Sequence, residues 1–194
     1  MIMSERKSAP DMTYRITFAA MMAAMIFVVT MFRFPLLGSK VHFANAVCLL
    51  SGMLLGPVTG GVASGLGSAI YDVYGGYDFV GVLITFVSKF AMGYVTGLIM
   101  QKWESPSLPD TAKTVVAAVA GAFTYVALYM LKTFIYQRYV YGFAMDAVGA
   151  TMISKLIPSL INAAVAVVAA PIFYYAIRPV LAKTGLIKHM RPGL

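Results

Sequence analysis

The stretch from Val41 to Gly76 constrains the fold most, because no charged residue lies between His42 and Asp72. Small residues recur along it at four-residue spacing: Gly52, Gly56 and Gly60 in one series, and Gly61 and Gly65 in another. This spacing lets helix backbones approach each other closely inside a bilayer. Together with the break at Gly56-Pro57, it predicts two short apolar helices folded back on each other, with the other helices packed around them.

The composition indicates that lipid is the natural solvent of this chain. Of its 194 residues, 60% are hydrophobic and 11% are charged, against about 25% charged in soluble domains. A soluble core of this size could not bury so much apolar surface. No strand-like alternation of barrel type is present, so we expect an all-α fold, a six-helix integral membrane bundle. Cys48, the single cysteine, is interpreted as a small buried hydrophobe.

We expect one membrane domain over residues 1–194, with a leader at 1–12 and a basic tail at 178–194. The apolar segments and their breaks place six spans at about 13–32, 41–55, 58–74, 79–100, 113–139 and 147–177. The second and third are short for a full crossing of about 30 Å. The last is interrupted by Pro158 and Pro171.

The basic residues predict the orientation. Nine lie on the side of the termini: Arg6, Lys7, Arg15, Lys102, Lys113, Arg178, Lys183, Lys188 and Arg191. Four lie on the opposite side: Arg33, Lys40, Lys132 and Arg138. The positive-inside rule then predicts that both termini are cytoplasmic, in a multi-pass protein of the cell membrane. The net charge of +8 is assigned to orienting charges and lipid headgroups rather than to nucleic acid, because no basic face with interleaved aromatic residues appears.

Signatures of catalysis are scarce. The two histidines, His42 and His189, are far apart, and the sequence has no zinc-binding helix motif, nucleophile elbow or phosphate-binding loop. We therefore predict no catalytic residue, no metal site and no cofactor. An enzyme acting within the membrane and a solitary small transporter or channel remain the alternative classes.

Polar residues inside apolar runs are the better functional candidates. An ionisable residue at membrane depth costs at least about 2.5–3.5 kcal/mol, so it faces the bundle interior and has a partner. Lys89 is expected either to bind backbone carbonyls or Asp72, or to contact a ligand. Lys155 either extends to the interface or contacts a ligand. Asn45 and Asn162 are further candidates within apolar runs.

In the predicted topology, several rings and charges converge on the outer half of the bundle. They are Phe34, Lys40, Asn45, Tyr71, Asp72, Tyr74, Tyr129, Lys132, Tyr136, Lys155 and Ser159. Any one tyrosine could belong to an interfacial aromatic belt. The set as a whole comes from five segments, which favours a pocket for a small polar or planar ligand. The predicted substrate-binding residues are Phe34, Lys40, Asn45, Asp72, Tyr74, Lys89, Tyr129, Lys132, Tyr136, Lys155 and Asn162.

A stripe of alanines marks the first segment, with Ala19 and Ala23 in one pair and Ala20 and Ala24 in the other. Small residues at this spacing can pack inside the bundle or form a docking face for a partner subunit. The spacing alone does not decide between these two roles.

Taken together, these features resemble the substrate-binding S component of an energy-coupling factor (ECF) transporter, an ABC-type uptake system. The similarity rests on the alanine stripe, on Leu55-Gly56-Pro57, on Gly65-x-Gly67-Ser68 ending in Asp72, and on Lys89 with Gly93 and Gly97. It implies a vitamin-binding subunit with a lid at Arg33–His42. It also implies that Ala19, Ala20, Ala23 and Ala24 dock on a transmembrane coupling subunit, and that two cytoplasmic ATPases supply energy.

The resemblance leaves the ligand open. The local pattern is most similar to members assigned to hydroxymethylpyrimidine or pyridoxine, and tyrosine and phenylalanine suit such planar rings. The lysines and Arg33 would instead suit a carboxylate vitamin such as pantothenate.

Overall fold

The structure is a computed structural model and describes residues 12–36, 39–102 and 109–186. It confirms six helices: α1 Met12–Met31, α2 Ala44–Leu55, α3 Pro57–Tyr74, α4 Phe79–Lys102, α5 Asp110–Ile135 and α6 Met145–Lys183. The strands β1 Arg33–Leu36 and β2 Ser39–His42 follow α1, and a π-helical turn, η1 Tyr136–Val140, extends α5. Helices dominate the described chain, as the composition predicts.

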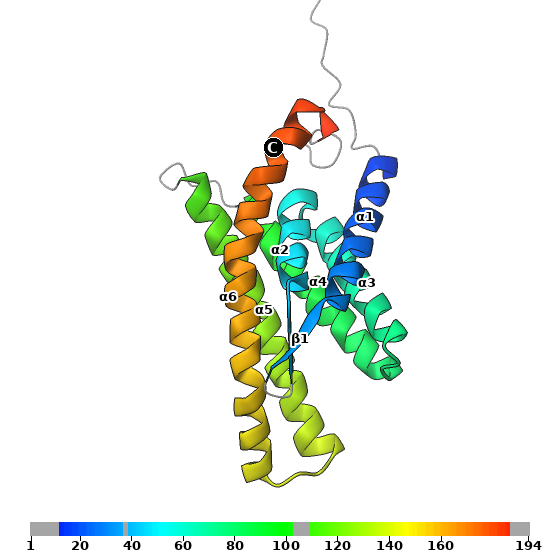
Figure 1. Cartoon of the computed structure of the whole chain (residues 1–194), viewed down its shortest axis with the longest axis vertical. Helices are drawn as coiled ribbons and strands as arrows, with labels where there is room; N and C mark the ends of the chain where they lie inside the picture. The colour runs from blue at the N-terminus through cyan, green and yellow to red at the C-terminus, as the bar shows by residue number, and fades with distance from the viewer. Residues whose placement is uncertain (1–11, 37–38, 103–108, 187–194) are drawn as a thin grey trace, which may run out of the picture.

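The helices run back and forth between two ends of the molecule (Figure 1). The start of α1 and the end of α6 lie at one end, and the connection between α5 and α6 lies at the other. Within the described residues, four helical segments are long and apolar enough to cross a membrane: α1, α4, α5 with η1, and α6. All 12 residues of α2 are buried, so this helix forms the centre of the bundle rather than a lipid-facing span.

The glycines of the α2–α3 pair allow the close approach that their spacing predicts. Gly56 ends α2 with φ of +79°, a backbone conformation that L side chains rarely adopt. One turn into α3, a Cβ added at Gly60 would lie 2.6 Å from the Cα of Gly52. The two helices therefore touch backbone to backbone, as in other membrane pairs with small-residue spacing.

The same pair packs tightly against α4. A Cβ at Gly61 would lie 3.0 Å from the ring of Phe90, and one at Gly65 would lie 2.8 Å from the ring of Phe86. Between α2 and α3, the hydroxyls of Ser51 and Ser64 lie 2.8 Å apart, and Ser51 also donates to a carbonyl of α3. These buried polar contacts join helices where the hydrophobic effect provides little driving force.

The fifth and sixth helices differ in extent from their approximate predicted ranges. The fifth begins at Asp110, and the sixth runs unbroken from Met145 to Lys183 although it contains Pro158, Pro171 and Pro179. Proline is tolerated in membrane helices because neighbouring groups satisfy the backbone it frees. The predicted tail from residue 178 is thus helical for its first turns, and Arg178 lies 3.7 Å from the carboxylate of Asp110.

The connection after α1 was predicted to be a loop without regular structure, but it contains two strands. It forms an antiparallel hairpin in which Arg33 pairs with His42 and Phe34 pairs with Val41. Pro35 is accommodated because the hairpin has only two strands, so each is an edge strand. The strands fix which side chains of this segment face the bundle, since alternate residues point to opposite sides.

Candidate functional site

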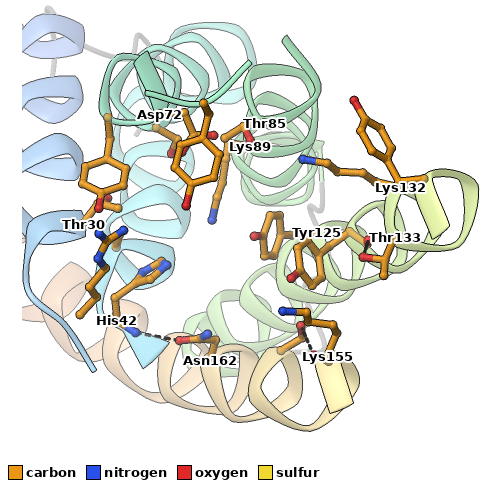
Figure 2. Close-up of a pocket in the computed structure, with 18 of the residues that line it drawn as sticks. Thr30, His42, Asp72, Thr85, Lys89, Tyr125, Lys132, Thr133, Lys155 and Asn162 are labelled. Carbon is orange, nitrogen blue, oxygen red and sulfur yellow. Dashed lines mark hydrogen bonds between the residues drawn. The ribbon is translucent and has the colours of Figure 1, made fainter. Parts of the chain in front are cut away.

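A cavity of about 490 Å³ lies between the helices (Figure 2). Its wall is formed by the half of the bundle that lies away from the start of α1 and the end of α6 (Figure 1). Parts of all six helices and of the hairpin contribute to this wall. The helical parts are the end of α1, the start of α2, the end of α3, the first half of α4, the second half of α5 with η1, and the first half of α6. A volume of this size lies within the range of about 300–1,000 Å³ typical of small-molecule sites.

The structure brings most of the predicted substrate-binding residues into this wall. Seven of them line the cavity: Asp72, Lys89, Tyr129, Lys132, Tyr136, Lys155 and Asn162. Tyr71 and Ser159, which belonged to the predicted outer cluster, line it as well. These residues come from α3, α4, α5, η1 and α6, so the fold gathers side chains that lie far apart in the sequence.

Four predicted residues are placed differently. Asn45 is buried behind the wall, where it contacts Lys89. Phe34 is 67% exposed, because on β1 it alternates with Arg33, which faces the cavity. Tyr74 is 72% exposed and its ring packs edge-on against Phe27, with centroids 5.9 Å apart. The side chain of Lys40 lies outside the described residues.

Lys89 forms the deepest charged group of the wall. It is only 4% exposed, and its Nζ donates a hydrogen bond to Oδ1 of Asn45. The same Nζ lies 3.7 Å from the ring centroid of Tyr125, a cation–π contact that is stronger where water is excluded. Its direct partners are therefore an amide and a ring, rather than the carbonyls or Asp72 that the sequence suggested.

The α5 side of the cavity is mostly aromatic. The rings of Tyr125 and Tyr129 lie stacked with centroids 6.0 Å apart and an interplanar angle of 23°. Further along the same face, Nζ of Lys132 lies 5.6 Å from the ring centroid of Tyr136. Figure 2 shows Lys132 and Lys89 approaching the cavity from different sides, with Tyr125 between them and Lys155. Flat rings and separated cations thus share one surface.

The hairpin covers another side of the cavity and is tied to two helices. The guanidinium of Arg33 lies 5.3 Å from the ring centroid of Tyr71 on α3. The backbone N–H of His42 donates to Oδ1 of Asn162 on α6 at 2.9 Å, drawn as a dashed line in Figure 2. Arg33 and His42, the first and last residues of the segment expected to form a lid, therefore both line the cavity.

Several wall residues were not predicted as site residues. They are Thr30, Ala44, Ser68, Tyr77, Thr85, Tyr125, Thr133, Gln137 and Tyr141. One signal was available for part of this set, because Tyr125, Thr133 and Gln137 share a helix face with the predicted Tyr129, Lys132 and Tyr136. Among the described residues, no group of three His, Cys, Asp or Glu side chains could hold a metal ion.

The alanines of α1 divide between two environments. Ala23 is 7% exposed and packs on α3, where a Cβ at Gly67 would lie 3.0 Å from the Cα of Ala23. Ala19 is half-buried, whereas Ala20 and Ala24 are exposed on the surface of the bundle. One pair of the stripe thus faces inward and the other outward.

Comparison with known proteins identifies the family. A family model described as "ECF-type riboflavin transporter, S component" matches residues 11–179. The chain belongs to this family. The S component is accordingly a membrane-embedded transport protein, the substrate-binding part of an ECF system and not an enzyme.

The fold of the S component is also similar to a solved structure. The chain matches the protein described in "Structure and mechanism of the S component of a bacterial ECF transporter" with a TM-score of 0.67. The match covers 88% of this chain and 99% of the other at 16% identity, so the likeness concerns the fold. No curated protein matched the chain.

Proposed function

We propose that this S component binds riboflavin in the cavity and serves as the vitamin-binding subunit of an ECF uptake system. The observation that carries the proposal is the wall itself, in which tyrosine rings alternate with hydroxyl and amide groups. The tricyclic ring of riboflavin needs flat apolar contacts, whereas its imide and its chain of hydroxyls need hydrogen-bond partners. The family description points to the same vitamin.

Riboflavin replaces hydroxymethylpyrimidine and pyridoxine as the first choice. A single-ring ligand would occupy only part of a cavity of about 490 Å³. A tricyclic ring with a polyol chain can contact both the stacked pair Tyr125 and Tyr129 and the more distant polar residues on α5 and α6.

One observation favours a second candidate, a carboxylate vitamin such as pantothenate. Among the described residues, the charged groups of the wall are four cations and one carboxylate: Arg33, Lys89, Lys132 and Lys155 against Asp72. An excess of cations attracts an anionic ligand. We rank it second because three of the cations already face rings of the wall: Arg33 over Tyr71, Lys89 over Tyr125 and Lys132 over Tyr136.

Titration of the purified S component in detergent tests the proposal. Quenching of flavin fluorescence should give saturable binding of riboflavin, while pantothenate, pyridoxine and hydroxymethylpyrimidine in excess should fail to displace it. Displacement by pantothenate with weak riboflavin binding would favour the second candidate. Absence of riboflavin binding would refute the first.

The remaining parts of the proposal are the orientation and the partners. We infer that both termini are cytoplasmic, so that the cavity opens to the outside, and that a transmembrane coupling subunit and two ATPases drive uptake. A cysteine introduced at Gly142 should react with a membrane-impermeant maleimide on whole cells, and one at Thr184 should not. Riboflavin flux into liposomes containing the S component alone would instead support a solitary transporter.

A further inference from the structure

The end of α5 contains an irregular turn that changes which residues face the cavity. Up to Gln137, wall residues follow helical spacing at Tyr129, Lys132, Thr133, Tyr136 and Gln137. A regular helix would next present Val140, four residues after Tyr136. Instead the N–H of Tyr141 donates to the carbonyl of Tyr136 at 2.9 Å, five residues back. Tyr141 lines the cavity after this turn, whereas Val140 does not.

The turn is held in place by further contacts. The N–H of Phe143 donates to the backbone carbonyl of Gln137 at 3.0 Å. The side chain of Arg138 donates to the carbonyl of Phe143 at 3.1 Å. The rings of Tyr136 and Tyr141 pack edge-on with centroids 6.2 Å apart. These contacts fix the backbone from which the side chain of Gln137 extends. Single π-turns of this kind occur frequently at functional sites.

Gln137 has an acceptor that the protein does not satisfy. Its side-chain Oε1 is buried and has no hydrogen-bond partner among the residues that the structure describes. Burial of an acceptor without a donor is unfavourable, and each such atom in a folded protein needs an explanation. Because Gln137 lines the cavity, a donor on the occupant of the cavity would satisfy it.

We propose that Gln137 is a ligand-binding residue whose side-chain oxygen accepts a hydrogen bond from a hydroxyl of the ligand's polyol chain. This inference rests on the proposed binding of riboflavin. Gln137 follows Tyr129 by eight residues, about 12 Å along the helix. A flat ring placed against Tyr125 and Tyr129 would therefore extend its hydroxyl chain toward Gln137. An uncharged amide suits a hydroxyl, which is also uncharged.

The test compares Gln137→Met with Gln101→Met, a matched substitution at an exposed position near the end of α4. Methionine keeps the length of the side chain and removes the acceptor. Each variant is titrated with riboflavin and with lumiflavin, which carries the same ring and a methyl group in place of the polyol. We expect Gln137→Met to weaken riboflavin binding by about three- to tenfold and to leave lumiflavin binding within about twofold. Gln101→Met should leave both unchanged.

The melting temperature without ligand provides a second measurement. Since the substitution removes an unsatisfied acceptor, the ligand-free Gln137→Met variant should melt no lower than wild type. A lower melting temperature would mean that the glutamine has a structural role and would overturn the inference. Unchanged riboflavin affinity, or an equal loss for both flavins, would also overturn it. Wild-type protein that binds no riboflavin would refute the proposed function, and the inference with it, before any variant is compared.

Discussion

Replacing Gly60 by alanine tests whether the α2–α3 contact carries the stability of the bundle. The added Cβ would lie 2.5 Å from the carbonyl oxygen of Ser51 and 2.6 Å from the Cα of Gly52. Ordinary van der Waals contacts begin at 3.4 Å, so the shorter of these contacts would require the two backbones to separate by 3.4 − 2.5 = 0.9 Å at this point. Backbone atoms cannot swing away as a flexible side chain can, and the separation would loosen the neighbouring contacts of α4.

Such overpacking costs typically about 1–3 kcal/mol. At about 2–4 °C per kcal/mol for a chain of this size, the melting temperature should fall by roughly 2–12 °C. The matched control is Gly149→Ala in α6, where nothing lies within 4 Å of the added Cβ. There, alanine favours the helix by about 0.8–1.0 kcal/mol, and the melting temperature should rise.

The assay is thermal unfolding of the purified protein in detergent, followed by the loss of helical circular dichroism. Identical substitutions should thus shift the midpoint in opposite directions. If Gly60→Ala melted at or above wild type, the helices would not be in backbone contact and the glycine-spacing argument would be wrong. A fall for Gly149→Ala as well would mean that alanine is unfavourable in this bundle regardless of space.

Three further outcomes follow from the site and the surface. Lys89→Met should weaken riboflavin binding by at least about tenfold if the ammonium reaches the ligand, since hydrogen bonds to charged groups contribute about 1.5–3 kcal/mol; unchanged affinity would mean that it only supports the wall. Ala24→Leu should reduce copurification with the coupling subunit while riboflavin affinity and melting temperature stay unchanged. Ala23→Leu should instead lower the melting temperature, because Ala23 packs on α3. If both variants lost only the partner, both alanines would belong to the docking face. Asn162→Leu removes the hydrogen bond to β2 and should speed riboflavin release in stopped-flow fluorescence, and an unchanged rate would show that the hairpin does not retain the ligand.

The helices of the core could be predicted from the sequence because the features that define them lie within each helix. Four-residue glycine spacing and the Gly56-Pro57 break define the α2–α3 pair directly, and the structure confirms both helices. Hydropathy likewise located the other four. The break expected at Pro158 and Pro171 was wrong, because tolerance of proline depends on neighbouring helices that a single sequence does not show.

The site was harder to predict because it depends on which faces meet. Phe34 and Arg33 are adjacent in sequence, yet only Arg33 lines the cavity, since the strand register decides the side. Tyr141 lines the cavity directly after a π-turn, and the sequence pattern does not indicate that turn. The charged candidates Asp72, Lys89 and Lys155 were recognisable because charge at membrane depth is costly, whereas Gln137 and Thr133 carry no such signal.

The bundle separates the part that holds it together from the part that surrounds its ligand. Glycines allow close packing of α2, α3 and α4. One face of α5, with η1 and the residue after it, supplies seven wall residues: Tyr125, Tyr129, Lys132, Thr133, Tyr136, Gln137 and Tyr141. Substitutions along that single face could alter which vitamin is bound without disturbing the packing of α2, α3 and α4. An engineered sensor for a different vitamin would accordingly start from a library of α5 variants in an otherwise constant chain.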